Sequence, residues 1–173
     1  PLIDRINEMD ENAETLFITP DEAISEITPT SLLIIVDTHN QDIVESPELY
    51  KKAKQVVVID HHRKMTNYIE NAVIFHHEPY ASSASEMVTE LVQYFGDAGK
   101  LSQYGAEALL SGIMLDTKSF VMRTGVRTFE AAAYLRKMGA DTVAVRSLFA
   151  NSMESYHEKT KLVASAEVYE RCA

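Results

Sequence analysis

The amino-acid sequence predicts an α/β fold, in which a parallel β-sheet with flanking helices is followed by a helical half. Two short runs, residues 31–36 (SLLIIV) and 55–59 (QVVVI), are continuously apolar, as is typical of parallel strands buried on both faces. A helical pattern separates these runs, and from Ser83 onward only helix-like segments follow. This order of elements indicates a β-α-β arrangement with right-handed crossovers.

Local signals place the elements of the first half. Residues 2–9 are expected to end a helix and residues 15–18 to form a short strand. A helix start is predicted next, with Thr19 as the capping side chain, Pro20 in the first turn and Glu22 three residues after the cap. Residues 47–53 are expected to form a short helix between the apolar runs, and residues 72–75 a third strand.

The second half is predicted to be helical. Ser83 and Glu86 form another capping box, opening a helix to about residue 95, and Gly96 and Gly99 mark the turn after it. Further helices are expected over residues 103–115, 127–138, 141–149 and 154–171. We therefore divide the chain into a domain over residues 1–150 and a polar linker helix over residues 151–173.

Composition limits the classes of function. The 173 residues are enough for one domain, and the net charge of −10 disfavours unaided binding to duplex nucleic acid. No apolar run approaches the roughly 18 residues of a membrane span, and the single cysteine, Cys172, cannot form an internal disulfide, which fits a reducing compartment. Because the chain opens at Pro1 without methionine, we expect it to be part of a longer protein.

Three aspartates stand at the ends of apolar segments. Asp37 and Asp60 directly follow the two predicted strands, and Asp116 ends a predicted apolar helix. The carboxyl ends of parallel strands face one crevice, so Asp37 and Asp60 should lie close together, accompanied by nearby histidines. Each aspartate alone could simply cap a helix or occupy a loop. Crowded carboxylates with imidazoles favour a divalent ion, with Mn²⁺ suited and Mg²⁺, Fe²⁺ or Co²⁺ as alternatives.

Three motifs resemble those of the DHH phosphoesterase superfamily. VDTH at residues 36–39, DHH at 60–62 and GIMLDTKSF at 112–120 resemble its second, third and fourth motifs, in the same order. Residues 78–91 and 123–141 resemble the DHH domain of GdpP-type cyclic-di-AMP phosphodiesterases more closely than manganese pyrophosphatases or RecJ exonucleases. The resemblance covers roughly residues 15–150, so this part of the chain is interpreted as a partial DHH domain.

The resemblance implies a role for each motif residue. Asp37 would bridge two Mn²⁺ ions, and His61 and Asp116 would complete the coordination of the second ion. His62 would face the scissile phosphate, while Asp60 would lie behind the ligands and orient them, so that His62, His61 and Asp60 form the catalytic group. The implied reaction is hydrolysis of cyclic-di-AMP to 5'-pApA by a two-metal-ion mechanism.

The sequence departs from the family pattern at two points. The first motif, His-x-x-x-Asp-x-Asp, which would supply three more ligands, does not occur, and neither does the C-terminal DHHA1 domain. The 173 residues alone are therefore expected to be inactive. The resemblance further implies the cytoplasmic domain of a bacterial cell-membrane protein, anchored through N-terminal segments outside this sequence, and a homodimer is compatible with it.

Alternative functions remain open from the residues alone. Within the superfamily, a short-oligoribonucleotide hydrolase or a pyrophosphatase would use the same ions. Outside catalysis, the chain could be a truncated nucleotide-binding or interaction module.

Five further residues are candidates for substrate binding. They are polar or basic side chains near the motifs, namely His39, Ser83, Lys118, Arg123 and Arg127. His39 could equally orient a neighbour or pack in its loop, and Ser83 could simply cap its helix. The three basic residues could steer an anionic substrate or be ordinary surface charges. The pair His76 and His77 follows the predicted third strand and is expected to be structural.

Overall fold

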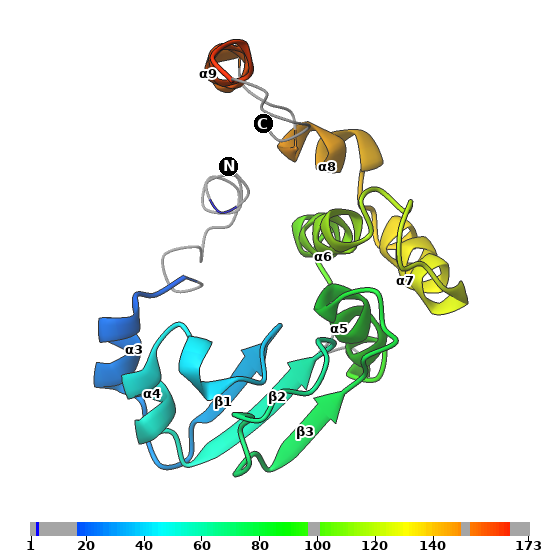
Figure 1. The fold of residues 1–173 in the computed structure, drawn as a ribbon. Helices are drawn as coiled ribbons and strands as arrows, with labels where there is room; N and C mark the ends of the chain where they lie inside the picture. Colours follow the sequence, from blue (N-terminus) through cyan, green and yellow to red (C-terminus); the bar gives the residue numbers. More distant parts are fainter. Residues whose placement is uncertain (1–2, 4–16, 97–100, 150–152, 167–173) are drawn as a thin grey trace.

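The structure, a computed structural model, describes residues 3, 17–96, 101–149 and 153–166 (Figure 1). The expected helix end at residues 2–9, most of the expected strand at 15–18, Gly99 and Cys172 lie outside the described residues. Residues 17 and 18, which are described, are not in a strand.

A three-stranded parallel sheet forms the base of the molecule. Its strands are β1 (Leu32–Val36), β2 (Gln55–Asp60) and β3 (Ile74–His77), in the order β1-β2-β3. The register aligns Val36 with Ile59 and Asp60 with His77, so the carboxyl ends of all three strands meet at one edge of the sheet. This confirms the predicted parallel α/β class.

The third strand begins later than predicted. The expected strand over residues 72–75 is instead β3 over Ile74–His77, although the backbone N–H of Val73 already donates to the carbonyl of Val56, at 2.8 Å. The apolar residues Ala72 and Val73 lead into the strand, and the ladder with β2 starts only at Ile74. The shift places both His76 and His77 within the sheet.

Short helices cover the two faces of the sheet. On one face, η1 (Gln41–Ile43), α4 (Pro47–Lys52) and the segment before β3 surround a cluster of Ile35, Val56, Val58 and Ile69. On the other face, α5 (Ala84–Val92) packs Met87 onto Val57 and Ile59. The preceding α3 (Pro20–Glu26) begins with the predicted capping box, in which Thr19 and Glu22 exchange hydrogen bonds.

The apolar side chains of β1 that point to the α5 side of the sheet remain largely in solvent. Leu32, Ile34 and Val36 are 49%, 52% and 44% exposed, because α5 covers β2 and does not extend over β1.

The helical half has a core of its own. It contains α6 (Gln103–Asp116), α7 (Val126–Lys137) and α8 (Thr142–Leu148), whose cluster includes Leu110, Ile113 and Leu135. Helix α5 contacts β2 as well as α6 and α7, so it connects the sheet with this second core (Figure 1). A last helix, α9 (Met153–Ala164), follows α8. The division of the chain at residue 150 stays a prediction.

No helix in the described part of the chain is both long and apolar enough to span a bilayer.

Candidate active site

Asp37 stands at the end of β1 in an unusual backbone conformation. Its φ angle is +68°, in the left-handed region that aspartate tolerates better than most residues. The N–H of Asp37 donates to the carbonyl of Ile59 at 2.9 Å, which continues the β1–β2 ladder by one bond. The bond and the left-handed turn together hold the Asp37 side chain beside the end of β2. Strained conformations of this kind are concentrated at functional sites.

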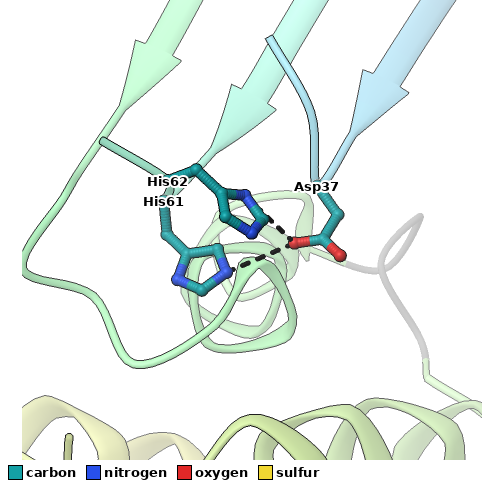
Figure 2. Close-up of side chains that lie close together, drawn as sticks. All are labelled: Asp37, His61 and His62. Carbon is teal, nitrogen blue, oxygen red and sulfur yellow. Dashed lines mark ion pairs between the residues drawn. The ribbon is translucent and has the colours of Figure 1, made fainter. Parts of the chain in front are cut away.

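His61 lies between two carboxylates. Its Nε2 atom is 3.3 Å from Asp37 Oδ1 (Figure 2). The same atom is 3.7 Å from Asp116 Oδ2, and the His61 side chain is buried. Asp37 follows β1, His61 follows β2, and Asp116 is the last residue of α6. The structure therefore brings the three predicted metal ligands together, from three separate elements.

His62 approaches the same carboxylate from the solvent side. Its Nδ1 atom is 3.9 Å from Asp37 Oδ1 (Figure 2). The same atom is 2.7 Å from Asp60 Oδ1, and the His62 side chain is half exposed. Because Nδ1 of His62 donates a hydrogen bond to Asp60, the other nitrogen of the His62 ring, Nε2, remains for a different partner.

Asp60 is the buried centre of this arrangement. Besides the His62 ring, it accepts hydrogen bonds from the backbone N–H groups of His61, at 2.8 Å, and His62, at 3.2 Å, and from Nδ1 of His39. Burial raises the pKa of Asp60, but the hydrogen bonds from His39 and His62 together outweigh it and hold the pKa below its usual value. Asp60 thus holds the DHH turn through four hydrogen bonds, and the orienting role implied by the resemblance stays a prediction.

His39 is held beneath the site by both ring nitrogens. The N–H of Met65 donates to Nε2 at 2.9 Å, so the proton of the neutral ring is on Nδ1 and is donated to Asp60. The residue is 1% exposed. This buried placement favours an orienting role for His39 over direct contact with a substrate.

His77 has a larger part in the site than its sequence context suggests. Its Nε2 atom is 2.6 Å from the carbonyl oxygen of His62, and its ring meets that of His39 edge-on at 5.2 Å between centroids. His39, Asp60 and His77 form a second cluster of potential ligand atoms behind the first. Only the β2–β3 register, which pairs Asp60 with His77, brings this residue to the DHH turn.

The electrostatics of the site favour a cation. Partial burial raises the pKa of Asp116 above its usual value, and the charge of Asp37 raises it further against the opposing effect of His61. Potential ligand atoms of Asp37, His61 and His62 lie within 4.8 Å of one another. Carboxylate and imidazole donors in this combination fit a divalent ion such as Mn²⁺.

The remaining substrate-binding candidates separate into two groups. Ser83 is fully buried and caps α5 through the N–H of Glu86, and Arg127 forms a bidentate ion pair with Glu90, at 2.6 and 2.7 Å. Both side chains are thus already engaged in contacts within the fold. Lys118 and Arg123 belong to the exposed loop after α6, where both adopt left-handed backbone conformations.

A cleft of about 930 Å³ opens beside the aspartate–histidine cluster. It is lined by residues of the DHH turn, the turn before α5 and the loop before α7, including His61, His62, Arg63, Tyr80 and Arg123. Of the predicted substrate-binding residues, Arg123 is the one that lines this cleft. Arg63 and Tyr80 were not singled out by sequence, although Arg63 directly follows the DHH motif.

Comparison with known proteins identifies the family. The sequence matches the DHH family, N-terminal domain, over residues 2–113, and the chain belongs to that family. The cyclic-di-AMP phosphodiesterase PdeA of Listeria monocytogenes is 43% identical over 166 residues, covering 95% of this chain and 25% of the relative. The cyclic-di-AMP phosphodiesterase GdpP of Geobacillus thermodenitrificans is 49% identical over 153 residues, covering 88% of this chain and 23% of the relative. The chain thus spans about a quarter of the length of these relatives.

A solved structure supports the fold. An exopolyphosphatase-related protein from Bacteroides fragilis superposes with a TM-score of 0.71 at 21% identity, covering 95% of this chain and 46% of the other. The predicted membership of the DHH superfamily, close to the cyclic-di-AMP phosphodiesterases, is confirmed by these comparisons.

Proposed function

We propose that this chain forms part of a metal-dependent phosphodiesterase that hydrolyses cyclic-di-AMP to 5'-pApA. The observation that carries the proposal is the convergence of Asp37, His61 and Asp116 at the carboxyl end of the sheet, next to an open cleft. Two relatives with this activity in their names, at 43% and 49% identity, support the choice of substrate.

The metal would be held by Asp37, His61 and Asp116. Mn²⁺ is the proposed ion because it accepts both carboxylate and imidazole ligands, and Mg²⁺, Fe²⁺ or Co²⁺ could replace it. In a two-ion site, such metals activate water and neutralise charge on a phosphate. With these three ligands alone the 173-residue chain should hold one ion weakly and lack turnover, since the His-x-x-x-Asp-x-Asp ligands are not among its residues.

The protein groups around the metal ligands have separate tasks. Asp60 orients the DHH turn through its bonds to the backbone of His61 and His62, which keeps both imidazoles in place. His62, with Nδ1 bound to Asp60, would present Nε2 to the phosphate in the cleft. Arg123, which also lines the cleft, would bind a non-bridging phosphate oxygen.

The rival activities differ in substrate and not in site chemistry. A short-oligoribonucleotide hydrolase or a pyrophosphatase would use the same ligands, and location in the bacterial cytoplasm would suit each of them. The relatives at 43% and 49% identity are named as cyclic-di-AMP phosphodiesterases, which favours the cyclic dinucleotide.

The experiment compares turnover of cyclic-di-AMP, pApA and pyrophosphate with Mn²⁺, by the intact protein that contains this chain. Asp37→Ala should lower turnover of cyclic-di-AMP more than about a hundredfold, beyond the roughly 10–100-fold cost of losing an orienting residue. Asp21→Ala, which removes an exposed carboxylate on α3, is the matched control. Near-normal activity of Asp37→Ala at saturating Mn²⁺ would contradict the ligand assignment, and preference for pyrophosphate would favour the rival.

A further inference from the structure

Tyr80 is an aromatic residue displayed in solvent at the wall of the cleft. It is 95% exposed, and it lines the same cavity as His61 and His62. A ring with so little buried area adds almost nothing to the hydrophobic stabilisation of the fold. Core packing therefore does not account for a tyrosine at this position.

The backbone beneath Tyr80 is held rigidly. The N–H of Glu78 donates to the carbonyl of Asp60 at 3.0 Å, and the N–H of Ala81 closes a turn onto the carbonyl of Glu78, also at 3.0 Å. Pro79 occupies the second position of this turn, where its fixed φ angle is favourable. The turn is thus bonded to the residue that fixes the DHH motif, so the ring and the candidate metal ligands share one scaffold.

Two guanidinium groups line the same cavity. Arg63 follows the DHH motif, and Arg123 comes from the loop before α7. In the part of the chain that the structure describes, neither forms an ion pair, whereas Arg127 pairs with Glu78 and Glu90. In a chain of net charge −10, these two positive groups make the cleft locally suited to an anion.

We propose that Tyr80 is a stacking platform for a nucleotide base, and that Arg63 and Arg123 bind the phosphate attached to that nucleotide. The inference rests on the proposed function and adds a position for one base of the substrate. Aromatic side chains stack on any base through its π-face, and guanidinium groups bind phosphate oxygens with two parallel hydrogen bonds. The cleft volume, about 930 Å³, lies within the usual range for small-molecule sites.

The test measures binding of two probes that differ only in the base, AMP and ribose 5-phosphate. Backbone amide NMR titrations of the 173-residue chain are made at saturating Mg²⁺, a diamagnetic ion. Tyr80→Ala should weaken AMP binding roughly 5- to 150-fold, the range that base–aromatic stacking implies, and leave ribose 5-phosphate unchanged. Tyr80→Phe keeps the ring and should stay within about twofold of the wild type. Arg63→Met should weaken both probes alike.

Tyr94 provides a matched control. It is 87% exposed and is not among the residues that line the cleft, so Tyr94→Ala should leave both affinities unchanged. If AMP and ribose 5-phosphate bind the wild type equally and Tyr80→Ala changes neither, the base subsite is wrong while the phosphate site stands. If the wild type binds neither probe, the base subsite and the phosphate site are both wrong, whereas the proposed function is decided separately by turnover of cyclic-di-AMP by the intact protein.

Discussion

Gly112→Ala is a sharp test of how α6 is positioned. A Cβ atom at residue 112 would stand 2.0 Å from Ser85 Oγ and 2.9 Å from Ser85 Cβ on α5. The hydroxyl can rotate away, but the Ser85 Cβ can only move with the backbone of α5. Since ordinary carbon–carbon contacts are about 3.5–4.0 Å, the two helices would have to separate.

The expected magnitude comes from a comparison within the same helix. A Cβ at Gly105 would meet the Leu101 Cδ1 atom at 2.9 Å, and this flexible side-chain end can move away. Each Gly→Ala change gains up to about 1 kcal/mol of helix propensity, so the difference between the two variants mainly reports packing. Overpacking costs about 1–3 kcal/mol, and Gly112→Ala should therefore be less stable than Gly105→Ala by that amount.

The assay is thermal and urea unfolding of both variants, followed by circular dichroism. The difference should appear as a melting temperature roughly 2–12 °C lower for Gly112→Ala, at about 2–4 °C per kcal/mol for a chain of this size. Adding Ser85→Gly should restore part of the loss. Because Asp116 lies four residues after Gly112 on the same helix face, Mn²⁺ affinity should fall as well. Equal stability of the two alanine variants would refute the claim that α5 and α6 approach closely at Gly112.

Three other perturbations test the site and its surroundings. Asp60→Asn should lower Mn²⁺ affinity by about 10–100-fold in a calorimetric titration, because it weakens the acceptor that holds the DHH turn, and an unchanged affinity would count against this role. Because the pKa of Asp116 is raised in the folded protein, protonated Asp116 stabilises the fold relative to the unfolded chain. This stabilisation is complete below the pKa that Asp116 has in the unfolded chain, and it is lost as pH rises through the pKa of the folded protein. Asp116→Asn should therefore stabilise the metal-free protein at pH 7, with a gain that shrinks towards pH 4, and a gain independent of pH would argue against an ionised Asp116. Arg127→Met should cost about 1 kcal/mol or less in urea unfolding, since its ion pairs are still partly exposed to solvent, and a larger cost would indicate a structural role for these pairs.

Local chemistry made much of the fold predictable. The start of α3 depends on Thr19, Pro20 and Glu22, which are adjacent in sequence, and the structure contains the predicted capping box. The strands β1 and β2 are continuous apolar runs, so the positions of Asp37 and Asp60 at their ends followed directly. The convergence of these residues required only the general rule that parallel strands end at one edge.

The contacts that sequence did not reveal join residues far apart in the chain. Arg127 and Glu90 are 37 residues apart in sequence, and His77 and His62 are 15 residues apart. No local sequence pattern therefore predicts either contact. The strand β3 starts two residues after its predicted start, because the segment between β2 and β3 has no periodic pattern of apolar residues that would mark its beginning. The register of β3 with β2 depends instead on tertiary contacts. The left-handed backbone of Asp37 was also not predictable, since aspartate adopts several conformations after a strand.

The origin of the three candidate ligands has a consequence for folding cooperativity. Asp37 and His61 belong to the sheet, with its own apolar clusters, whereas Asp116 belongs to α6 in the separate helical core. In the described part of the chain, α5 makes extensive contacts with both cores. Without an ion, the helical core should therefore be able to open as a sub-global unit at less than the full free energy of unfolding. An ion bound by all three side chains would be released by that opening, and amide hydrogen exchange in α6 would then slow as the ion concentration rises, until sheet and helices unfold as one unit.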